Sequence, residues 1–144
     1  MKVKNIINLK INNMANAFIH SKSSVKRFGG VIEDYLQIHI KMDCSKAYIP
    51  DNRHRILTHT SFWIHEVMIP IYGYMFKNSD GKDVSVKDVC EQHILEDFAM
   101  KFIPTPQDFI ENMNFQDWMQ NGLKGTPSSF KKLSDKEHIK VNLD

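Results

Sequence analysis

SVKDVCEQHILED, residues 85–97 of the chain, predicts both a helix and an unusual helix face. Ser85 and Asp88 have the spacing of a capping box, which favours a helix over residues 86–98. The face of that helix expected to point inward consists of Val86, Cys90, His93 and Asp97, which are spaced by four, three and four residues. An imidazole and a carboxylate therefore stand where apolar residues are expected, and a buried charge needs a partner.

Apolar periodicity predicts further helices on both sides of this stretch. Asp51 is expected to cap the start of the helix at 52–68, and Pro70 is expected to end it. Gly29 marks the end of the helix at 21–28. Two short β-prone runs flank Asp80-Gly81, which is a hairpin signal. The predicted helices cover about residues 2–19, 21–28, 32–47, 52–68, 86–98 and a segment that begins at Thr105 and Pro106.

These elements predict a mainly α (α+β) fold. A chain of 144 residues with 42% hydrophobic residues is long enough for one core. We expect a compact domain of about five helices with one small β-hairpin near residues 74–84. The domain organisation that follows is a basic amphipathic N-terminal helix (1–19), a single globular helical domain (20–121) and a polar C-terminal tail (122–144).

Charge and composition exclude some classes of protein. No apolar run reaches the ~20 residues that a membrane-spanning helix needs, so no membrane partner is expected. Two cysteines without a C-x-x-C spacing fit a reducing cytosol, which predicts a cytoplasmic protein. The first 30 residues carry a charge of +6 within a chain of net +2. This basic start is typical of a packing helix, with a nucleic-acid arm as an alternative.

Seven histidines suggest a metal site, and helix geometry limits how it can form. On one regular helix His54 and His59 lie about 140° apart, and His65 lies about 16 Å along the axis from His54. These three side chains cannot share one ion on a regular helix. A metal site must therefore draw its ligands from several helices, and the candidate ligands are His20, His39, His54, His59, His93 and Asp97.

Two histidine and aspartate pairs have the i,i+4 spacing that lets side chains converge on a helix. They are His39 with Asp43 and His93 with Asp97. His39, His93 and Asp97 are the candidate acid, base or metal-ligand residues of an active site. The structural alternative is that Asp97 only accepts a hydrogen bond from His93 or pairs with Arg53 or Arg55. The chain has neither H-E-x-x-H nor an adjacent His-Asp dipeptide, which counts against a phosphohydrolase of the HD type.

HSKSSVKRFGG, residues 20–30, combines hydroxyls and cations without any acid. If Ser21 caps a short helix, free backbone amides and nearby cations would form a phosphate cradle. A second cationic group, R-H-R at 53–55, opens the next predicted helix and suits bidentate phosphate binding. The candidate ligand-binding residues are Ser21, Lys22, Ser23, Ser24, Lys26, Arg27, Arg53 and Arg55. The alternative is a solvated polar turn with internal salt bridges.

Several motifs together resemble a family of small uncharacterised proteins from tailed phages and bacteria. They are HSKSSVKRFGG, EDYLQIH, DNRHRILTH, NSDGK, DVSVKDV, EQHILED and IPTPQDF, and they span about residues 20–109. The resemblance implies that the domain proper begins near His20 and that the basic helix before it is an addition. It places His20, His39, Arg53, His54, His59, Glu91, His93 and Asp97 among the marked positions and His65 outside them. It implies no activity.

Three hypotheses of function follow. In the first, a His/Arg/Ser pocket binds a phosphate-bearing ligand, such as a nucleotide or nucleic acid, with a divalent metal as the candidate cofactor and metal-assisted hydrolysis as the reaction class. In the second, the chain is a non-catalytic phage accessory protein in the host cytoplasm that inhibits or modulates a host protein. It would use an exposed apolar helix or the Phe109/Phe115/Trp118 region. In the third, the basic arm contacts nucleic acid. Sequence patterns do not determine the oligomeric state.

Overall fold

The fold is known from a computed structural model that describes residues 16–116 and residue 119. Most of the predicted N-terminal helix (1–19), Trp118 and the predicted tail (122–144) lie outside the described residues. The described residues up to Phe109 form one compact unit, and Ile110 begins a second. No helix among the described residues is both long and apolar enough to cross a bilayer.

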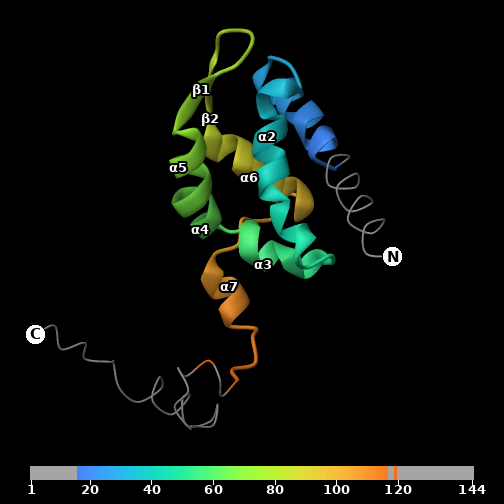
Figure 1. The fold of residues 1–144 in the computed structure, drawn as a ribbon, viewed down its shortest axis with the longest axis vertical. Helices are drawn as coiled ribbons and strands as arrows, with labels where there is room; N and C mark the ends of the chain where they lie inside the picture. Colours follow the sequence, from blue (N-terminus) through green and yellow to red (C-terminus); the bar gives the residue numbers. More distant parts are fainter. Residues whose placement is uncertain (1–15, 117–118, 120–144) are drawn as a thin grey trace, which may run out of the picture. The chain divides into compact units, whose positions relative to one another are not determined.

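The structure confirms a mainly helical fold with one antiparallel β-hairpin (Figure 1). In the hairpin Met75 pairs with Ser85, and Lys77 pairs with Asp83. Two 3-10 segments (η1, η2) and one π-helical turn (η3) interrupt the α-helices. After a helix at residues 16–28, the order is α2 (Glu33–Met42), η1 (Cys44–Ala47), η2 (Asn52–His54), α3 (Arg55–Thr58), α4 (Ser61–Trp63), η3 (Ile64–Met68), α5 (Ile69–Tyr72), β1 (Met75–Lys77), β2 (Asp83–Ser85), α6 (Val86–Asp97) and α7 (Pro106–Ile110).

Helix α6 is central to the packing, since it contacts α2, η3 and α5. The predicted cap is present, because Ser85 Oγ accepts a hydrogen bond from the Asp88 amide at 3.2 Å. The core between these elements buries Tyr35, Ile38, Met42, Ile64, Met68, Val84, Val86, Val89, Cys90 and Ile94. Each large apolar side chain contributes about 1.5–3 kcal/mol by leaving water. Burial also raises the pKa of the Cys90 thiol to about 12, so Cys90 is an unreactive core residue.

The prediction that Ser21 starts a new helix is wrong. Residues 16–28 form one continuous helix, and the Ser21 hydroxyl donates back to the Ala17 carbonyl at 2.8 Å. Backbone amides inside a helix are already bonded, so Ser21 offers no free amides to an anion. Gly29 ends the helix as predicted, with φ +86°, a conformation that favours glycine.

The predicted single helix over residues 52–68 is also wrong. Asp51 caps its start, but α3 ends at Thr58, and His59 adopts φ −105° and ψ 52°. Thr60 is extended and its hydroxyl accepts a hydrogen bond from the Trp63 amide, so α4 begins afresh with its own cap. Pro70 does not stop the chain of helices either, because the widened π-turn η3 precedes it and Pro70 stands in the first turn of α5.

The hairpin loop is docked on the turn that precedes α2. Asn78 is buried, and its amide donates to the Phe28 carbonyl at 3.1 Å. Asp34 accepts hydrogen bonds from the amide and hydroxyl of Ser79, and Asp80 accepts one from the Gly30 amide at 2.8 Å. The turn and the loop therefore stabilise each other and fix the end of the first helix against α2.

Replacement of Gly30 by alanine should destabilise the protein strongly. Gly30 has φ +74°, and an added Cβ would collide with the Asp34 carboxylate that binds the hairpin loop. We expect Gly30→Ala to lower the free energy of unfolding by about 2–4 kcal/mol, from left-handed strain plus the lost hydrogen bonds. Urea unfolding followed by circular dichroism measures this loss.

Gly81 supplies the matched control for that substitution. It has the same φ of +74°, but no atom lies within 4 Å of its Cβ position. Gly81→Ala should therefore cost only the backbone strain, about 1 kcal/mol. Equal losses in the two variants would show that the Asp34 contact contributes nothing.

Candidate metal centre

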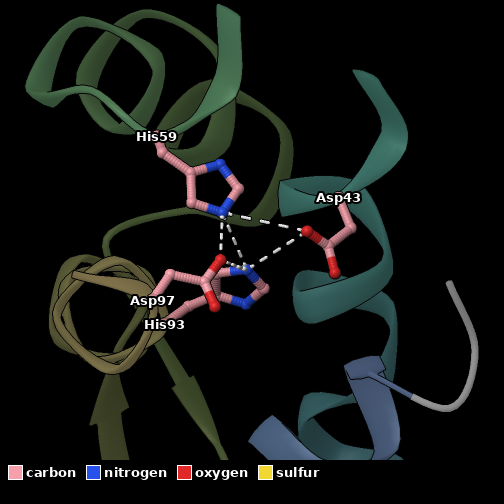
Figure 2. A group of neighbouring side chains, drawn as sticks. All are labelled: Asp43, His59, His93 and Asp97. Carbon is pink, nitrogen blue, oxygen red and sulfur yellow. Dashed lines mark hydrogen bonds and ion pairs between the residues drawn. The ribbon is translucent and has the colours of Figure 1, made fainter. Parts of the chain in front are cut away.

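Four side chains from three separate segments converge on one point (Figure 2). Asp43 follows the last turn of α2, His59 occupies the break after α3, and His93 and Asp97 lie one turn apart on α6. One ligand atom from each residue lies within 4.8 Å of the other three. The break places His59 outside a regular helix, between the end of α3 and the cap of α4.

The spacing of these atoms matches a small metal ion. His93 Nε2 lies 3.2 Å from His59 Nε2 and 3.5 Å from Asp43 Oδ1. Asp97 Oδ2 lies 2.8 Å from His59 Nε2 and 3.8 Å from His93 Nε2, and Asp43 Oδ1 lies 3.8 Å from His59 Nε2. Bonds of about 2.0–2.2 Å to a tetrahedral zinc ion give ligand-to-ligand distances of about 3.3–3.6 Å. These five distances scatter around that range, and the sixth, between the two carboxylates, is at most 4.8 Å.

Asp43 is the least satisfied member of the group. It is fully buried, and neither carboxylate oxygen takes part in a geometrically sound hydrogen bond with the described residues. Lys46 Nζ does lie 2.8 Å from Oδ2 as an ion pair. Oδ1 faces the rings of His59 and His93 instead. Burial opposes ionisation, but His93 and Lys46 hold the pKa of Asp43 well below its usual range. A buried carboxylate in this state requires a cation nearby.

A hydrogen-bonded chain supports His93 from behind. Its Nδ1 lies 2.9 Å from His39 Nδ1, and His39 Nε2 lies 2.8 Å from the Ser24 hydroxyl. Only one proton fits between two facing ring nitrogens, so at least one of the two rings is neutral. Outer contacts of this kind orient the ring of a metal-binding histidine and set its tautomer. With a proton on Nδ1, His93 would present a free lone pair at Nε2 to the centre.

A second chain orients His59. Its Nδ1 lies 2.9 Å from the Thr58 hydroxyl, which lies 2.9 Å from the Ser45 hydroxyl. Ser45 in turn contacts His54 Nδ1 at 3.0 Å. His54 Nε2 is buried without a hydrogen-bond partner among the described residues, and it is not part of the four-residue group. His54 therefore supports the centre from outside.

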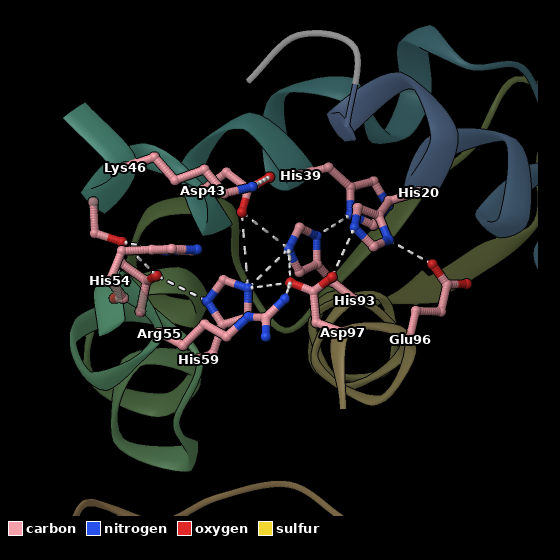
Figure 3. Close-up of polar contacts among 12 residues, drawn as sticks. His20, His39, Asp43, Lys46, His54, Arg55, His59, His93, Glu96 and Asp97 are labelled. Atoms are coloured by element: carbon pink, nitrogen blue, oxygen red, sulfur yellow. Dashed lines mark hydrogen bonds and ion pairs between the residues drawn. The ribbon is translucent and has the colours of Figure 1, made fainter. Parts of the chain in front are cut away.

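Asp97 is the only one of the four side chains that is partly exposed, at 16%. Arg55 Nη2 lies 3.5 Å from Asp97 Oδ2, and His20 Nε2 lies 3.5 Å from Oδ1 (Figure 3). His20 Nδ1 lies 2.5 Å from Glu96 Oε2. Burial disfavours the charged His20 ring, but the two carboxylates outweigh burial and raise the pKa of His20 to about 9. Asp97 is therefore the member of the group that is nearest to solvent.

The structure brings together most of the sequence-predicted metal candidates. His59, His93 and Asp97 supply ligand atoms, and His20, His39 and His54 contact these ligands or their supports. Sequence reasoning left Asp43 out of the candidate ligands. Its i,i+4 spacing from His39 was the available signal, but His39 points to His93, whereas Asp43 faces the centre itself.

The predicted phosphate-binding residues are divided between several places. Arg55 reaches the centre, and Ser24 bonds to His39. Arg53 instead forms a bidentate pair with Asp51 on the surface, and Lys22 stacks on the Phe18 ring. The remaining candidates are Ser21, which bonds within its helix, and Ser23, Lys26 and Arg27, which line a separate groove.

The donor set indicates the class of ion that fits. Two imidazole nitrogens with two carboxylate oxygens suit zinc and similar divalent transition metals better than the all-oxygen shells of calcium or magnesium. With four protein ligands, three of them fully buried, the site resembles a closed structural centre more than an open catalytic one. The partial exposure of Asp97 is the one feature that favours access by a ligand.

The metal-free protein should lose stability as the pH falls from 6.5 to about 4.5. Burial lowers the pKa of His93 and of His54 to about 4, and burial with nearby histidine charges lowers that of His39 to about 2. The unfolded chain protonates these rings near pH 6.5, so it binds more protons than the folded state in this range. The pKa of His20 is raised in the folded protein, so its contribution to the free energy of unfolding is fully present below pH 6.5. It is constant in this pH range and does not change the direction of the pH dependence. Each buried histidine lowers the free energy of unfolding by at most about 1.4 kcal/mol for each pH unit.

Urea unfolding in the presence of a chelator at several pH values measures this slope. The variant His54→Gln should reduce this dependence of stability on pH, because it removes one histidine that takes up a proton in the unfolded chain but not in the folded protein. His65 is exposed and outside the cluster, so His65→Gln should leave the slope unchanged. Identical slopes in both variants would rule out a role of His54 burial.

Comparison with known proteins adds a family but no activity. A family model described as a domain of unknown function, DUF6915, matches residues 15–119. No curated protein and no solved structure matches the chain. The match spans all four residues of the candidate metal centre and more than half of the chain. The chain belongs to the DUF6915 family of domains of unknown function.

Proposed function

We propose that this domain binds one divalent transition metal ion of the zinc class through Asp43, His59, His93 and Asp97. The observation that carries the proposal is the buried Asp43 carboxylate, whose Oδ1 has no hydrogen bond among the described residues and faces two ring nitrogens at 3.5 and 3.8 Å. Lys46 pairs with Oδ2 only. A metal ion would bind Oδ1 and the Nε2 lone pairs of His59 and His93. The contacts of His59 Nδ1 with the Thr58 hydroxyl and of His93 Nδ1 with His39 Nδ1 support the same reading, because a proton on each Nδ1 would leave Nε2 free for the ion.

The second part of the proposal concerns reactivity. We propose that the centre assists hydrolysis of a phosphate ester that approaches on the Asp97 side. Because the site offers four protein ligands, a water or phosphoryl oxygen would have to join as a fifth ligand. A zinc ion would then lower the pKa of that water to about 7 and polarise the phosphoryl oxygen. Arg55 lies beside Asp97 and is 23% exposed, and its buried Nε has no hydrogen-bond partner among the described residues. Its guanidinium would bind a phosphate oxygen, and its stacking on Phe98 holds it in place.

Metal binding is tested on untagged protein, because a polyhistidine tag would supply its own metal ligands. Elemental analysis should find about one zinc, manganese or iron per chain, and added metal should raise the unfolding temperature after chelator treatment. An ion at ~100 times its dissociation constant adds about 2.7 kcal/mol to the free energy of unfolding. Asp43→Asn should lose this effect, because the amide removes the buried charge and one anionic ligand.

The matched control for Asp43→Asn is Asp83→Asn. Asp83 is exposed and pairs with Lys77 in the hairpin, so its loss should leave metal binding unchanged. Wild-type protein that contains no metal and shows no shift with any divalent ion would refute the proposed centre. Equal metal binding by Asp43→Asn and wild type would do the same.

Reactivity is tested with para-nitrophenyl phosphate and its bis-ester on metal-loaded protein. We expect metal-dependent release of nitrophenol, with kcat/KM lowered at least about tenfold in Arg55→Gln, since a charge-assisted contact contributes roughly 1.5–3 kcal/mol. Arg55→Lys should retain part of the activity, and Lys101→Gln, at an exposed position, should retain all of it. A loaded protein that hydrolyses neither ester would leave a metal centre without this reactivity and contradict the second part of the proposal.

An exposed apolar surface favours a second candidate function. Tyr48 is 84% exposed, and it lies with Ile49, Pro50, Ile56 and Leu57 around one surface depression. Contiguous apolar surface of this kind is typical of protein-binding sites. We propose as the alternative that the chain acts without catalysis by binding a host protein there, as a small phage protein would in its host. Copurification of one stoichiometric protein, lost in Tyr48→Ser and retained in Asp43→Asn, would support this alternative.

A further inference from the structure

We propose that a groove between the helix at residues 16–28 and α6 binds a nucleoside 5′-monophosphate. Ser23, Lys26 and Arg27 line it from the first helix, and α6 and the turn after it line the other side. Its volume is about 640 Å³, within the range of roughly 300–1,000 Å³ of small-molecule sites. The inference goes beyond the proposed metal centre and does not depend on an ion.

An unpaired acceptor in the groove wall indicates a ligand. Gln92 is only 5% exposed, and its Nε2 donates to Glu96 Oε1 at 2.9 Å. Because a carboxylate oxygen accepts and does not donate, this bond fixes which end of the amide is nitrogen. Gln92 Oε1 is then a buried acceptor without any partner among the described residues, although Gln92 lines the groove. It calls for an N–H or O–H group, such as those of a base or a ribose.

The charge of the groove favours an anion at its other end. Lys26 and Arg27 are exposed, and neither forms an ion pair with a carboxylate in the described part of the chain. The one acid in the lining, Glu96, has both oxygens occupied, by Gln92 and by His20. The Ser23 side chain also hydrogen-bonds to Glu96, so the two cations are the groups that remain available for a phosphate group.

Apolar side chains supply a surface for a flat ring. Leu95 lies on α6, and Met100 follows the helix end, 64% exposed. Ala99 and Met100 both adopt left-handed conformations, with φ of 54° and 61°, which residues other than glycine rarely do. This strained turn holds Met100 in the groove wall. A methionine thioether makes favourable contacts with aromatic rings, so the lining suits a nucleobase better than a bare sugar phosphate.

The groove is a site separate from the metal centre. Lys26 is six residues from His20, which contacts Asp97, so it lies about 9 Å farther along the helix at 1.5 Å per residue. A phosphate held by Lys26 and Arg27 would not reach the metal ligands. We therefore expect this groove to bind its ligand without hydrolysing it.

Isothermal titration calorimetry with adenosine 5′-monophosphate tests the inference, in chelator and again with zinc. We expect saturable binding in both, with adenosine alone and inorganic phosphate alone at least about tenfold weaker, because each satisfies only one end of the groove. The double variant Lys26→Gln/Arg27→Gln should weaken binding at least about tenfold, and Gln92→Met about fivefold. The matched control for the double variant is Lys77→Gln/Lys82→Gln, which removes two exposed cations from the hairpin and should change the affinity less than about twofold.

Four outcomes would overturn the inference. The first is no saturable binding of the nucleotide, which would leave a groove that holds water only. The second is equal affinity for inorganic phosphate, which would remove the base and ribose from the ligand class. The third is an unchanged affinity in the Lys26→Gln/Arg27→Gln variant, whose exposed positions should not affect folding. The fourth is binding that requires zinc, because the ligand would then belong to the metal centre. Since metal content is measured separately, failure here and failure of the metal proposal are distinguishable.

Discussion

The buried Asp43 carboxylate is the constraint on which the rest of this structure depends. An isolated charge in a protein interior is costly, and it persists only where cations or hydrogen-bond donors face it. Here Lys46 satisfies one oxygen, and the other points between the rings of His59 and His93. The three segments that carry these groups must therefore meet at this point, because separation of any one of them would leave an unpaired buried group.

The polar centre lies beside the hydrophobic core and uses the same helix. On α6, Val89, Cys90 and Ile94 pack into the core, while His93 and Asp97 face the centre. The apolar contacts supply stability and hold α6 rigid, and the polar contacts decide how the neighbouring segments are oriented against it. The two hydrogen-bonded chains behind His93 and His59 restrict those orientations further. This division explains how a small domain positions four ligand atoms from three segments.

Local patterns in the sequence predicted the elements well where one residue type dictates a local conformation. The Ser85 cap, the Gly29 helix end and the Asp80-Gly81 turn follow from side-chain hydrogen bonding and left-handed backbone, which need no tertiary contact. The helix break at His59 and the passage of the helix through Pro70 were not predictable in this way. Periodicity continues through both points, and packing of Ile64 and Met68 into the core is compatible with a π-turn that no local rule demands.

The sequence by itself determined that an imidazole and a carboxylate, His93 and Asp97, share the inward face of one helix, because i,i+4 spacing fixes their direction. It also determined that any metal site must combine several segments. Only the tertiary structure decided that Asp43 and His59 complete the group and that Arg53 and Lys22 stay on the surface. The physical reason is that helical periodicity specifies which face a residue occupies, whereas the distance between faces of different helices depends on how the whole core packs.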